Sequence, residues 1–260
     1  HGHTPCIQIV NPQPEDHLII LDAGSGIKDL GYELAEHLQP NHHIHLFITH
    51  LHWDHIQGFP FFTPIYQKST RITIHGCHPH LEESFRLQQN EQNFPVGFDK
   101  LPAEIDFDMM EPGRDYSIGA YTIRAFPVPH PGGCFSYRVT RNGKSVVYAT
   151  DLEIKDFSDK TLQPYFNFFH GADYLIYDSM YTLPENIIKE DWGHSSCIIG
   201  VDVAAKSDVG CLVIFHHEPA YSDEKIYELY KNAHLYRKLR PNSQDIDIVI
   251  GYDGLTLDVI

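Results

Sequence analysis

A candidate metal-binding pattern lies at residues 49–55, where the sequence reads THLHWDH. With 19 His among 260 residues, shuffling would produce the spacing His-x-His-x-Asp-His only about once in a hundred sequences. His50 and His52 are two residues apart in extended chain, so they project to the same side and can share one metal. Asp54 and His55 follow after the chain turns and can face a second metal. The pattern predicts a metal site, and the alternative is a His-rich solvated loop.

Apolar segments lead into this pattern and into several other loops that carry His or Asp. Residues 44–48 are predicted to form the strand that delivers the pattern to a loop. Strands that bring ligands to one edge of a sheet are how an α/β fold assembles a site from distant parts of the chain. Further strands are predicted at 18–21, 71–75, 121–128, 145–149, 174–177, 211–215 and 246–250, and helices at 27–38, 81–92, after 196 and at 226–236.

Four of the later strands end at residues that can bind metal or move protons. His130 follows residues 121–128, Asp151 follows 145–149, and Asp178 follows 174–177, while His216 and His217 follow 211–215. Adjacent residues that leave a strand point to opposite faces, so only one of the last two His is expected to reach a metal.

Three residues near these strand ends have two interpretations each. Asp22 precedes a Gly-rich turn and either hydrogen-bonds a ligand His or caps the turn. Gly132 and Gly133 follow His130 and either allow a substrate close to the backbone or only form the turn. Two further His clusters are present. His75, His78 and His80 are expected to be polar loop residues, and His42, His43 and His45 are expected to face solvent or to support a ligand.

Composition favours one large α/β enzyme domain over residues 1–260, with residues 59–115 as a segment that covers the site and sets specificity. The chain has 19 basic and 35 acidic residues, a net charge of −16 with His neutral. This charge disfavours a protein that holds nucleic acid on a broad basic face. Bound divalent cations would offset the charge locally, so an anionic substrate is acceptable at the site.

The five cysteines are odd in number and widely spaced, which predicts reduced thiols. The longest wholly apolar run, residues 211–215, is only as long as a strand, and no signal peptide is visible. These features predict a cytoplasmic protein without a membrane span. The first residue is His rather than Met, as is typical of a processed or trimmed chain.

In order and content, these residues resemble the metallo-β-lactamase fold of dinuclear metallohydrolases. The resemblance covers nearly the whole chain and implies a four-layer αββα sandwich, an α/β fold with the metal site at one edge between the two sheets. Such proteins usually open with a further strand, and this chain is expected to start at or after that point. Within the superfamily the chain is most similar to the branch of RNase Z and the cyclic phosphodiesterases of phosphonate metabolism. That similarity rests on ATD at 149–151, YDSMY at 177–181, GHSS at 193–196 and FHHEP at 215–219.

The resemblance also implies a ligand set for two divalent ions. Mixed His and carboxylate ligands suit zinc, and manganese or iron is tolerated by similar sites. Two such ions lower the pKa of a bridging water or hydroxide and neutralise a phosphate oxygen, which suits in-line attack on a phosphodiester. One ion would take His50, His52 and His130, and the other Asp54, His55 and the late His, for which family register favours His216 over His217, with Asp151 bridging and Asp54 also orienting the hydroxide.

His194 lies in a loop that resembles the one donating a general acid in RNase Z-like enzymes. A His with a carboxylate partner can be held protonated near neutrality and can protonate a leaving alkoxide. Asp178 is the natural partner. The alternatives are a polar loop residue for His194 and a cap or turn acid for Asp178.

The predicted substrate is a small phosphodiester, cyclic or nucleotide-like. No Gly-rich or basic arm for gripping tRNA is visible, and the acidic composition also disfavours nucleic acid. Trp192, Tyr181 and Phe135 could stack on a base, or could serve in packing. The alternatives are a hydrolase of lactams, lactones or thioesters, an oxygen-reactive di-iron protein, and a metal-bound sensor without catalysis. Base rates favour a homodimer if the chain oligomerises.

Overall fold

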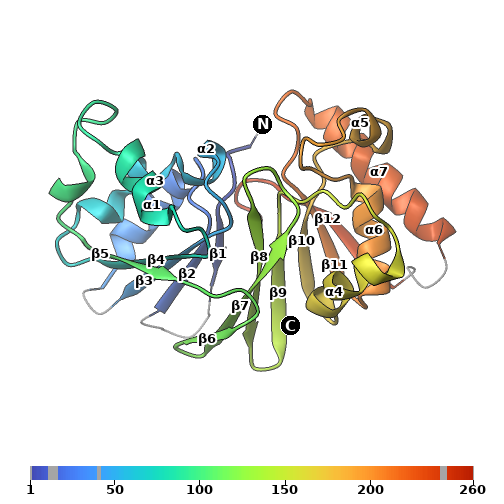
Figure 1. Ribbon diagram of the computed structural model, residues 1–260, viewed down its shortest axis with the longest axis horizontal. Helices are drawn as coiled ribbons and strands as arrows, with labels where there is room; N and C mark the ends of the chain where they lie inside the picture. The colour runs from blue at the N-terminus through green and yellow to red at the C-terminus, as the bar shows by residue number, and fades with distance from the viewer. Residues whose placement is uncertain (1, 11–16, 40–41, 241–244, 260) are drawn as a thin grey trace. The chain divides into compact units, whose positions relative to one another are not determined.

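A computed structural model describes residues 2–10, 17–39, 42–240 and 245–259. The chain forms two compact units, one from His3 to Glu111 and the other built mainly from Pro112 onward (Figure 1). Each unit has its own sheet, its own helices and its own apolar core.

The first unit holds a five-stranded sheet in the order β1-β2-β3-β4-β5. β1 is antiparallel to β2, and the other neighbouring strands are parallel, so the carboxyl ends of β2, β3 and β4 meet at one edge. The strands are β1 (Ile7–Ile9), β2 (His17–Leu21), β3 (His43–Ile48), β4 (Arg71–Gly76) and β5 (Glu104–Met109), and the α-helices are α1 (Ile27–His37), α2 (Trp53–Ile56) and α3 (Leu81–Gln88).

One face of this sheet forms the unit's core with the helices. Alternate residues of β2, β3 and β4, such as Ile20, Leu46 and Ile74, are fully buried and pack in one cluster with Ile27 of α1 and Phe85 of α3. Because side chains alternate along a strand, the intervening positions of the same strands face the other way. Several of these intervening positions are His.

The second unit holds a seven-stranded sheet in the order β12-β11-β10-β9-β8-β7-β6. The strands β9 to β12 are parallel, whereas β6, β7, β8 and β9 alternate in direction. The strands are β6 (Asp115–Ile118), β7 (Tyr121–Val128), β8 (Cys134–Arg141), β9 (Lys144–Ala149), β10 (Tyr174–Asp178), β11 (Cys211–Phe215) and β12 (Asp247–Ile250), and the helices are α4 (Asp159–Phe169), α5 (Leu183–Ile188), α6 (Cys197–Lys206) and α7 (Asp223–Leu239).

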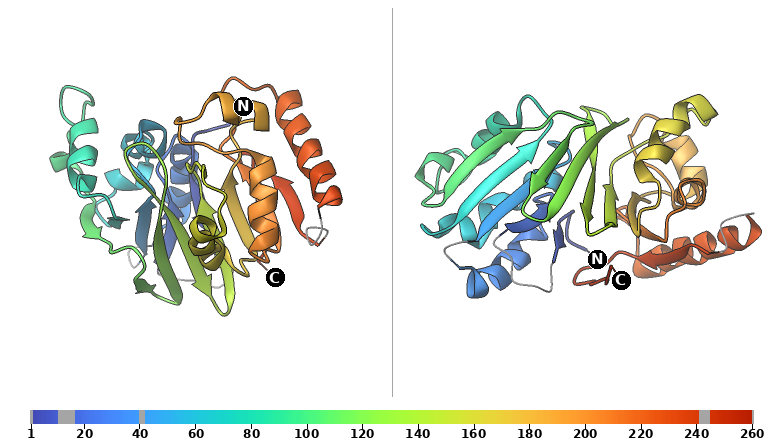
Figure 2. Two further views of the ribbon diagram at one scale, coloured as in Figure 1. Left: turned by 45° about the vertical axis from the view of Figure 1, so that its right-hand side comes forward. Right: turned by 90° about the horizontal axis from the view of Figure 1, so that it is seen from below.

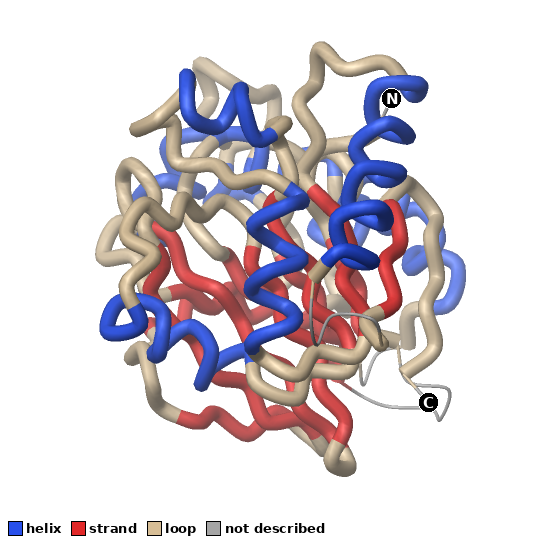
Figure 3. Tube along the Cα trace, turned by 90° about the vertical axis from the view of Figure 1, so that its right-hand side faces the viewer, coloured by secondary structure: helices blue, strands red, loops and turns tan. Residues whose placement is uncertain are grey.

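Helices cover one face of the parallel part of this sheet. Figure 2 shows α6 and α7 side by side, and Figure 3 shows them in front of the strands. Leu175 and Leu212 of the sheet pack with Val201 of α6, Leu229 of α7 and Phe169 of α4. Among the described residues, none of the helices combines the length and the apolar character that crossing a bilayer requires.

All eight strands predicted from sequence are present within one residue at either end. The predicted helices are present too, although α3 ends at Gln88 rather than near 92. Sequence reasoning missed β1, β5, β6, β8, α2, α4 and α5. β1 pairs with β2 in antiparallel orientation, and the expectation that the chain starts at or after the family's opening strand stays a prediction. The single-domain assignment and the covering role of 59–115 stay predictions.

Candidate metal and catalytic site

The pattern at residues 49–55 turns directly after β3. His52 is the residue before α2, which begins at Trp53, so the chain bends between the two pairs of predicted ligands. The ring centroids of His50 and His52 are 4.5 Å apart, and those of His50 and His55 are 4.2 Å apart. Asp54 Oδ2 lies 3.3 Å from His55 Nε2. The first unit therefore gathers the four predicted ligands of the pattern.

Asp22, at the end of β2, orients this turn. Its Oδ2 accepts a hydrogen bond from His55 Nδ1 at 2.7 Å, and its Oδ1 accepts the Thr49 backbone N–H at 2.8 Å. The Thr49 hydroxyl lies 2.8 Å from Asp22 Oδ2 and 3.1 Å from His50 Nδ1. A hydroxyl has one hydrogen. The Thr49 hydroxyl donates this hydrogen to Asp22 and accepts a hydrogen bond from His50. The rings of His50 and His55 therefore carry hydrogen on Nδ1 and keep a lone pair on Nε2, the atom that binds a metal.

Replacing Asp22 with Ala should destabilise the first unit and weaken metal binding. The buried donors of Thr49 and His55 would lose their acceptor, at about 1–3 kcal/mol each, and metal affinity should fall about 10–100-fold as the rings lose their orientation. Urea unfolding and elemental analysis measure the two effects. Asp22→Asn tolerates the observed φ of 60° and keeps one of the two acceptor oxygens, so both effects should be smaller than in Asp22→Ala. Equal metal content in Asp22→Ala and wild type would contradict the role.

In the second unit, strand ends bring together Asp151, Asp178 and His216. β9, β10 and β11 are parallel neighbours, so their carboxyl ends share one edge. His216 Nε2 lies 3.2 Å from Asp151 Oδ1, and His130 Nε2 lies 3.7 Å from Asp151 Oδ2. One ligand atom from each of Asp151, Asp178, His194 and His216 lies within 4.8 Å of the other three.

Of the two adjacent His, His216 is the one beside Asp151. His217 turns away and its Nε2 donates to the Gly251 carbonyl at 3.1 Å, while burial lowers the pKa of its ring. His216 and Asp151 have φ of 58° and 55°, a left-handed conformation that non-Gly residues rarely adopt. Such backbone conformations occur often at functional sites.

His130 is held by Gly193 from the loop before α6. The His130 Nδ1–H donates to the Gly193 carbonyl at 2.8 Å, and the Gly193 N–H donates to Glu153 Oε2 at 3.0 Å. This bond leaves the lone pair of His130 on Nε2, toward Asp151. A Cβ on Gly193, whose φ is 86°, would clash with His130 Nδ1. The sequence places Gly193 in a motif but carries no signal for its bond to Glu153.

Gly193→Ala should therefore displace the His130 ring and lower metal content. Gly143, which has a φ of 78° and would meet no atom within 4 Å if it carried a Cβ, is the matched control. Gly143→Ala carries the same backbone strain, about 1–2 kcal/mol, without the clash. Elemental analysis after dialysis should show a loss of metal only in Gly193→Ala. Equal metal content in the two variants would mean that His130 tolerates the shift.

His194 and Asp178 form the predicted pair. His194 Nδ1 lies 2.8 Å from Asp178 Oδ2, and the His194 ring stacks on His216 with centroids 5.1 Å apart. Asp178 also accepts the backbone N–H of Met180 at 3.1 Å and of Leu152 at 3.3 Å. Asp178 thus serves both as a turn acid and as the partner of His194.

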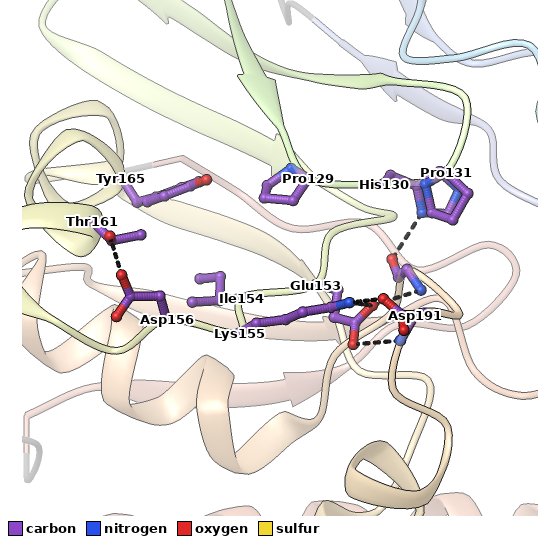
Figure 4. A pocket seen from close by; sticks show the side chains of 11 residues that line it. Pro129, His130, Pro131, Glu153, Ile154, Lys155, Asp156, Thr161, Tyr165 and Asp191 are labelled. Carbon is purple, nitrogen blue, oxygen red and sulfur yellow. Dashed lines mark hydrogen bonds and ion pairs between the residues drawn. The ribbon is translucent and has the colours of Figure 1, made fainter.

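A cavity of about 400 Å³ lies beside His130 within the second unit. Figure 4 shows Glu153, Lys155 and Asp191 linked across its wall, with Tyr165 and Thr161 at the other end. Lys155 is its basic lining residue, and an acidic partner lies on each side of it.

The remaining predicted residues lie around these groups. Trp192 is 61% exposed, and Lys189 Nζ lies over one face of its ring, 5.3 Å from the centroid. Gly132 and Gly133 have φ of 84° and 87° in the turn after His130, which fits the turn interpretation. The polar-loop expectation is wrong for His75, which lies in β4 and is 3% exposed. Of the two alternatives for His45, the solvent-facing one is wrong, because His45 lies in β3 and is 4% exposed.

Comparisons with known proteins place this geometry in a family. Residues 17–217 match the family described as β-lactamase superfamily domain. Ribonuclease Z of Lacticaseibacillus casei is 24% identical, over 86% of this chain and 81% of that protein. The short form of human tRNase Z has a TM-score of 0.67 at 15% identity over 99% of this chain and 93% of its own. Unliganded yeast PDE1 has a TM-score of 0.68 at 15% identity over 96% and 93%. These comparisons confirm the predicted fold class and family. They also confirm the predicted enzyme class, which is metal-dependent hydrolase.

Proposed function

The chain belongs to the β-lactamase superfamily, and we propose that it is a two-metal phosphodiesterase acting on a small, nucleotide-like or cyclic diester. The observation that carries the reaction class is the hydrogen bond of His194 to Asp178 within 4.8 Å of Asp151 and His216. A proton donor beside metal-binding groups is what departure of an alkoxide requires. Lactam, lactone and thioester hydrolysis on the same fold is the alternative chemistry.

The donor set fits two divalent ions. We propose His50, His52 and His130 for one ion and Asp54, His55 and His216 for the other, with Asp151 shared between them. In each unit the described hydrogen bonds fix ring hydrogens on Nδ1 of His50, His55 and His130, which leaves Nε2 to bind metal. Imidazole and carboxylate together suit zinc, and also manganese or iron.

The bound ions would lower the pKa of a shared water and neutralise charge on the phosphoryl oxygens. Asp54, whose side chain is 39% exposed, would orient the attacking oxygen. His194 would give the proton on its Nε2 to the leaving oxygen, while the negative charge of Asp178 stabilises the ring in its charged form. The hydrogen bond of Asp178 to Nδ1 also holds the ring in one orientation.

A small substrate is supported by the cavity beside His130. Its volume of about 400 Å³ falls within the range of small-molecule sites, roughly 300–1,000 Å³. Lys155 pairs with Glu153 and Asp191 and could exchange one of these partners for an anionic group, and Trp192 could stack on a base through the ring face that Lys189 does not cover.

RNA is the second candidate substrate, because relatives of this chain are named Ribonuclease Z. The net charge of −16 weighs against it. Three assays separate the candidates: a bis-aryl phosphodiester against a β-lactam and a lactone, a panel of 2′,3′- and 3′,5′-cyclic nucleotides, and a precursor tRNA. Turnover of a cyclic nucleotide with little cleavage of RNA would support the proposal. Efficient cleavage of the precursor tRNA, or turnover of only the lactam or lactone, would overturn it.

A further inference from the structure

A row of imidazoles crosses the first sheet at positions remote from the motif loop. His17 Nδ1 on β2 lies 2.9 Å from His45 Nε2 on β3, and His45 Nδ1 lies 2.9 Å from His75 Nε2 on β4. His75 Nδ1 lies 3.0 Å from Asp108 Oδ2 on β5. The strand register aligns these positions on the face opposite the Ile20 and Leu46 core. The row is therefore built by pairing of four strands.

The carboxylate at one end fixes the direction of the row. Asp108 accepts hydrogen, so His75 carries its ring hydrogen on Nδ1 and accepts at Nε2 from the Nδ1–H of His45. A neutral His45 then has a lone pair on Nε2, aimed at His17. Burial lowers the pKa of His45 to about 2 and the pKa of His75 as well, so neither ring is charged at neutral pH.

At the His17 end of the row, His43 adds a third imidazole beside those of His17 and His45. Its ring lies against that of His45 with centroids 3.9 Å apart, and its Nε2 lies 2.8 Å from the Thr73 hydroxyl. Burial first, and then the charge of Arg71, lower the pKa of His43 to about 4, so it too is neutral. One nitrogen from each of His17, His43 and His45 lies within 4.8 Å of the other two.

We propose that His17, His43 and His45 bind a further divalent transition-metal ion of the zinc class, separate from the two-metal site. His17 Nδ1 and His45 Nε2 are 2.9 Å apart. Two ligands at tetrahedral angles around an ion with bonds of about 2.0–2.1 Å are separated by roughly 3.3–3.4 Å, so the two nitrogens need to part by only a few tenths of an ångström. His17 and His43 are half-buried, and rotation of their rings would bring the third nitrogen to the ion. Nothing in this proposal depends on the proposed function.

The surroundings of the three imidazoles fit a metal site. A ligating His whose other nitrogen donates to a fixed acceptor is a regular feature of such sites, and here His75 and then Asp108 take that place behind His45. Acidic side chains of β5 would offset the charge of a cation, and Arg71, whose charge acts on His43, pairs with Glu104 at 3.9 Å. His45 is five residues before His50, roughly 16 Å of extended chain, so the two sites are distinct.

The test counts metal in variants. Purified protein is stripped with a chelator, titrated with Zn²⁺, passed through a desalting column and analysed for zinc. We expect His17→Gln and His43→Gln each to hold one equivalent fewer than wild type, with unchanged phosphodiester turnover. His80→Gln, which replaces an exposed His on a different segment, is the matched control and should hold as much zinc as wild type.

A double variant separates this proposal from the two-metal site. His50→Ala with His52→Ala removes proposed ligands of the catalytic centre and should still retain the equivalent that His17→Gln loses. Circular dichroism of the metal-free variants checks that each is folded, and His17 and His43 are both half-buried, so Gln is tolerable at either position. Equal zinc content in wild type, His17→Gln and His43→Gln would overturn the proposal, and the row would then be only a hydrogen-bonded chain of neutral rings.

Discussion

Removal of bound metal by a chelator is expected to abolish turnover of phosphodiesters. The proposed ions supply both an acidified water and neutralisation of phosphoryl charge, and losing them should remove about 4 kcal/mol or more of transition-state stabilisation, a ~10³-fold loss of rate. Turnover and metal content are measured on the same samples before and after dialysis. Zn²⁺ added back should restore both.

The amount of Zn²⁺ needed to restore activity separates the catalytic ions from the ion proposed at His17, His43 and His45. The His43→Gln variant should regain full activity, and the zinc it takes up in doing so should be one equivalent less than the zinc taken up by wild type. Acidification should weaken binding at the proposed ligands, because His must be deprotonated to bind metal. A metal-free sample that turns over at the wild-type rate would rule out the two-metal mechanism.

The strands that deliver the proposed ligands were predictable because each has two signals. An apolar run such as residues 211–215 marks a buried strand, and a His or Asp directly after it marks the edge where parallel strands end. The missed strands lack the first signal. β5 reads EIDFDM and β8 reads CFSYRVTR, each mixing polar and apolar residues. α4 was missed because Pro164 lies inside it, which argues against a helix in a sequence.

The hydrogen bonds that orient the ligands were less accessible to sequence reasoning. Asp22 and His55 are 33 residues apart and Gly193 and Glu153 are 40 apart, so their pairing depends on strand register and loop path. The imidazole row shows the same limit more strongly. His17, His45 and His75 lie on three strands, and no local pattern reveals that each faces the next. The polar-loop interpretation of His75 failed because it grouped His75 with His78 and His80, which follow it in sequence, although His75 itself lies in β4.

One backbone conformation recurs in the two ligand groups. Asp22, Asp151 and His216 each lie just past the end of a strand, and each has a φ between 55° and 60°. A left-handed residue there turns the chain sharply and points its side chain along the edge of the sheet. Asp and His are among the non-Gly residues that adopt this conformation most often. The same conformation thus occurs at Asp22, which orients the His55 ring in the first unit, and at Asp151 and His216, the proposed metal ligands of the second.

His194→Ala is expected to lower phosphodiester turnover about 10²–10⁴-fold while metal content stays at the wild-type value. Asp178→Asn should also lower turnover, but by a smaller factor, because Asn can still accept a hydrogen bond from His194 Nδ1. Because Asp178 also accepts backbone N–H groups of the loop, its variant needs an unfolding curve beside the rate.

The dependence on the leaving group distinguishes proton donation by His194 from a structural role. A nitrophenolate leaves without help from an acid, whereas an alkoxide such as a ribose oxygen needs its proton in the transition state. The loss in His194→Ala should therefore be large for a cyclic nucleotide and small for bis(p-nitrophenyl) phosphate. A structural role would slow both substrates by the same factor, and loss of metal from the variant would mean that His194 is a ligand instead.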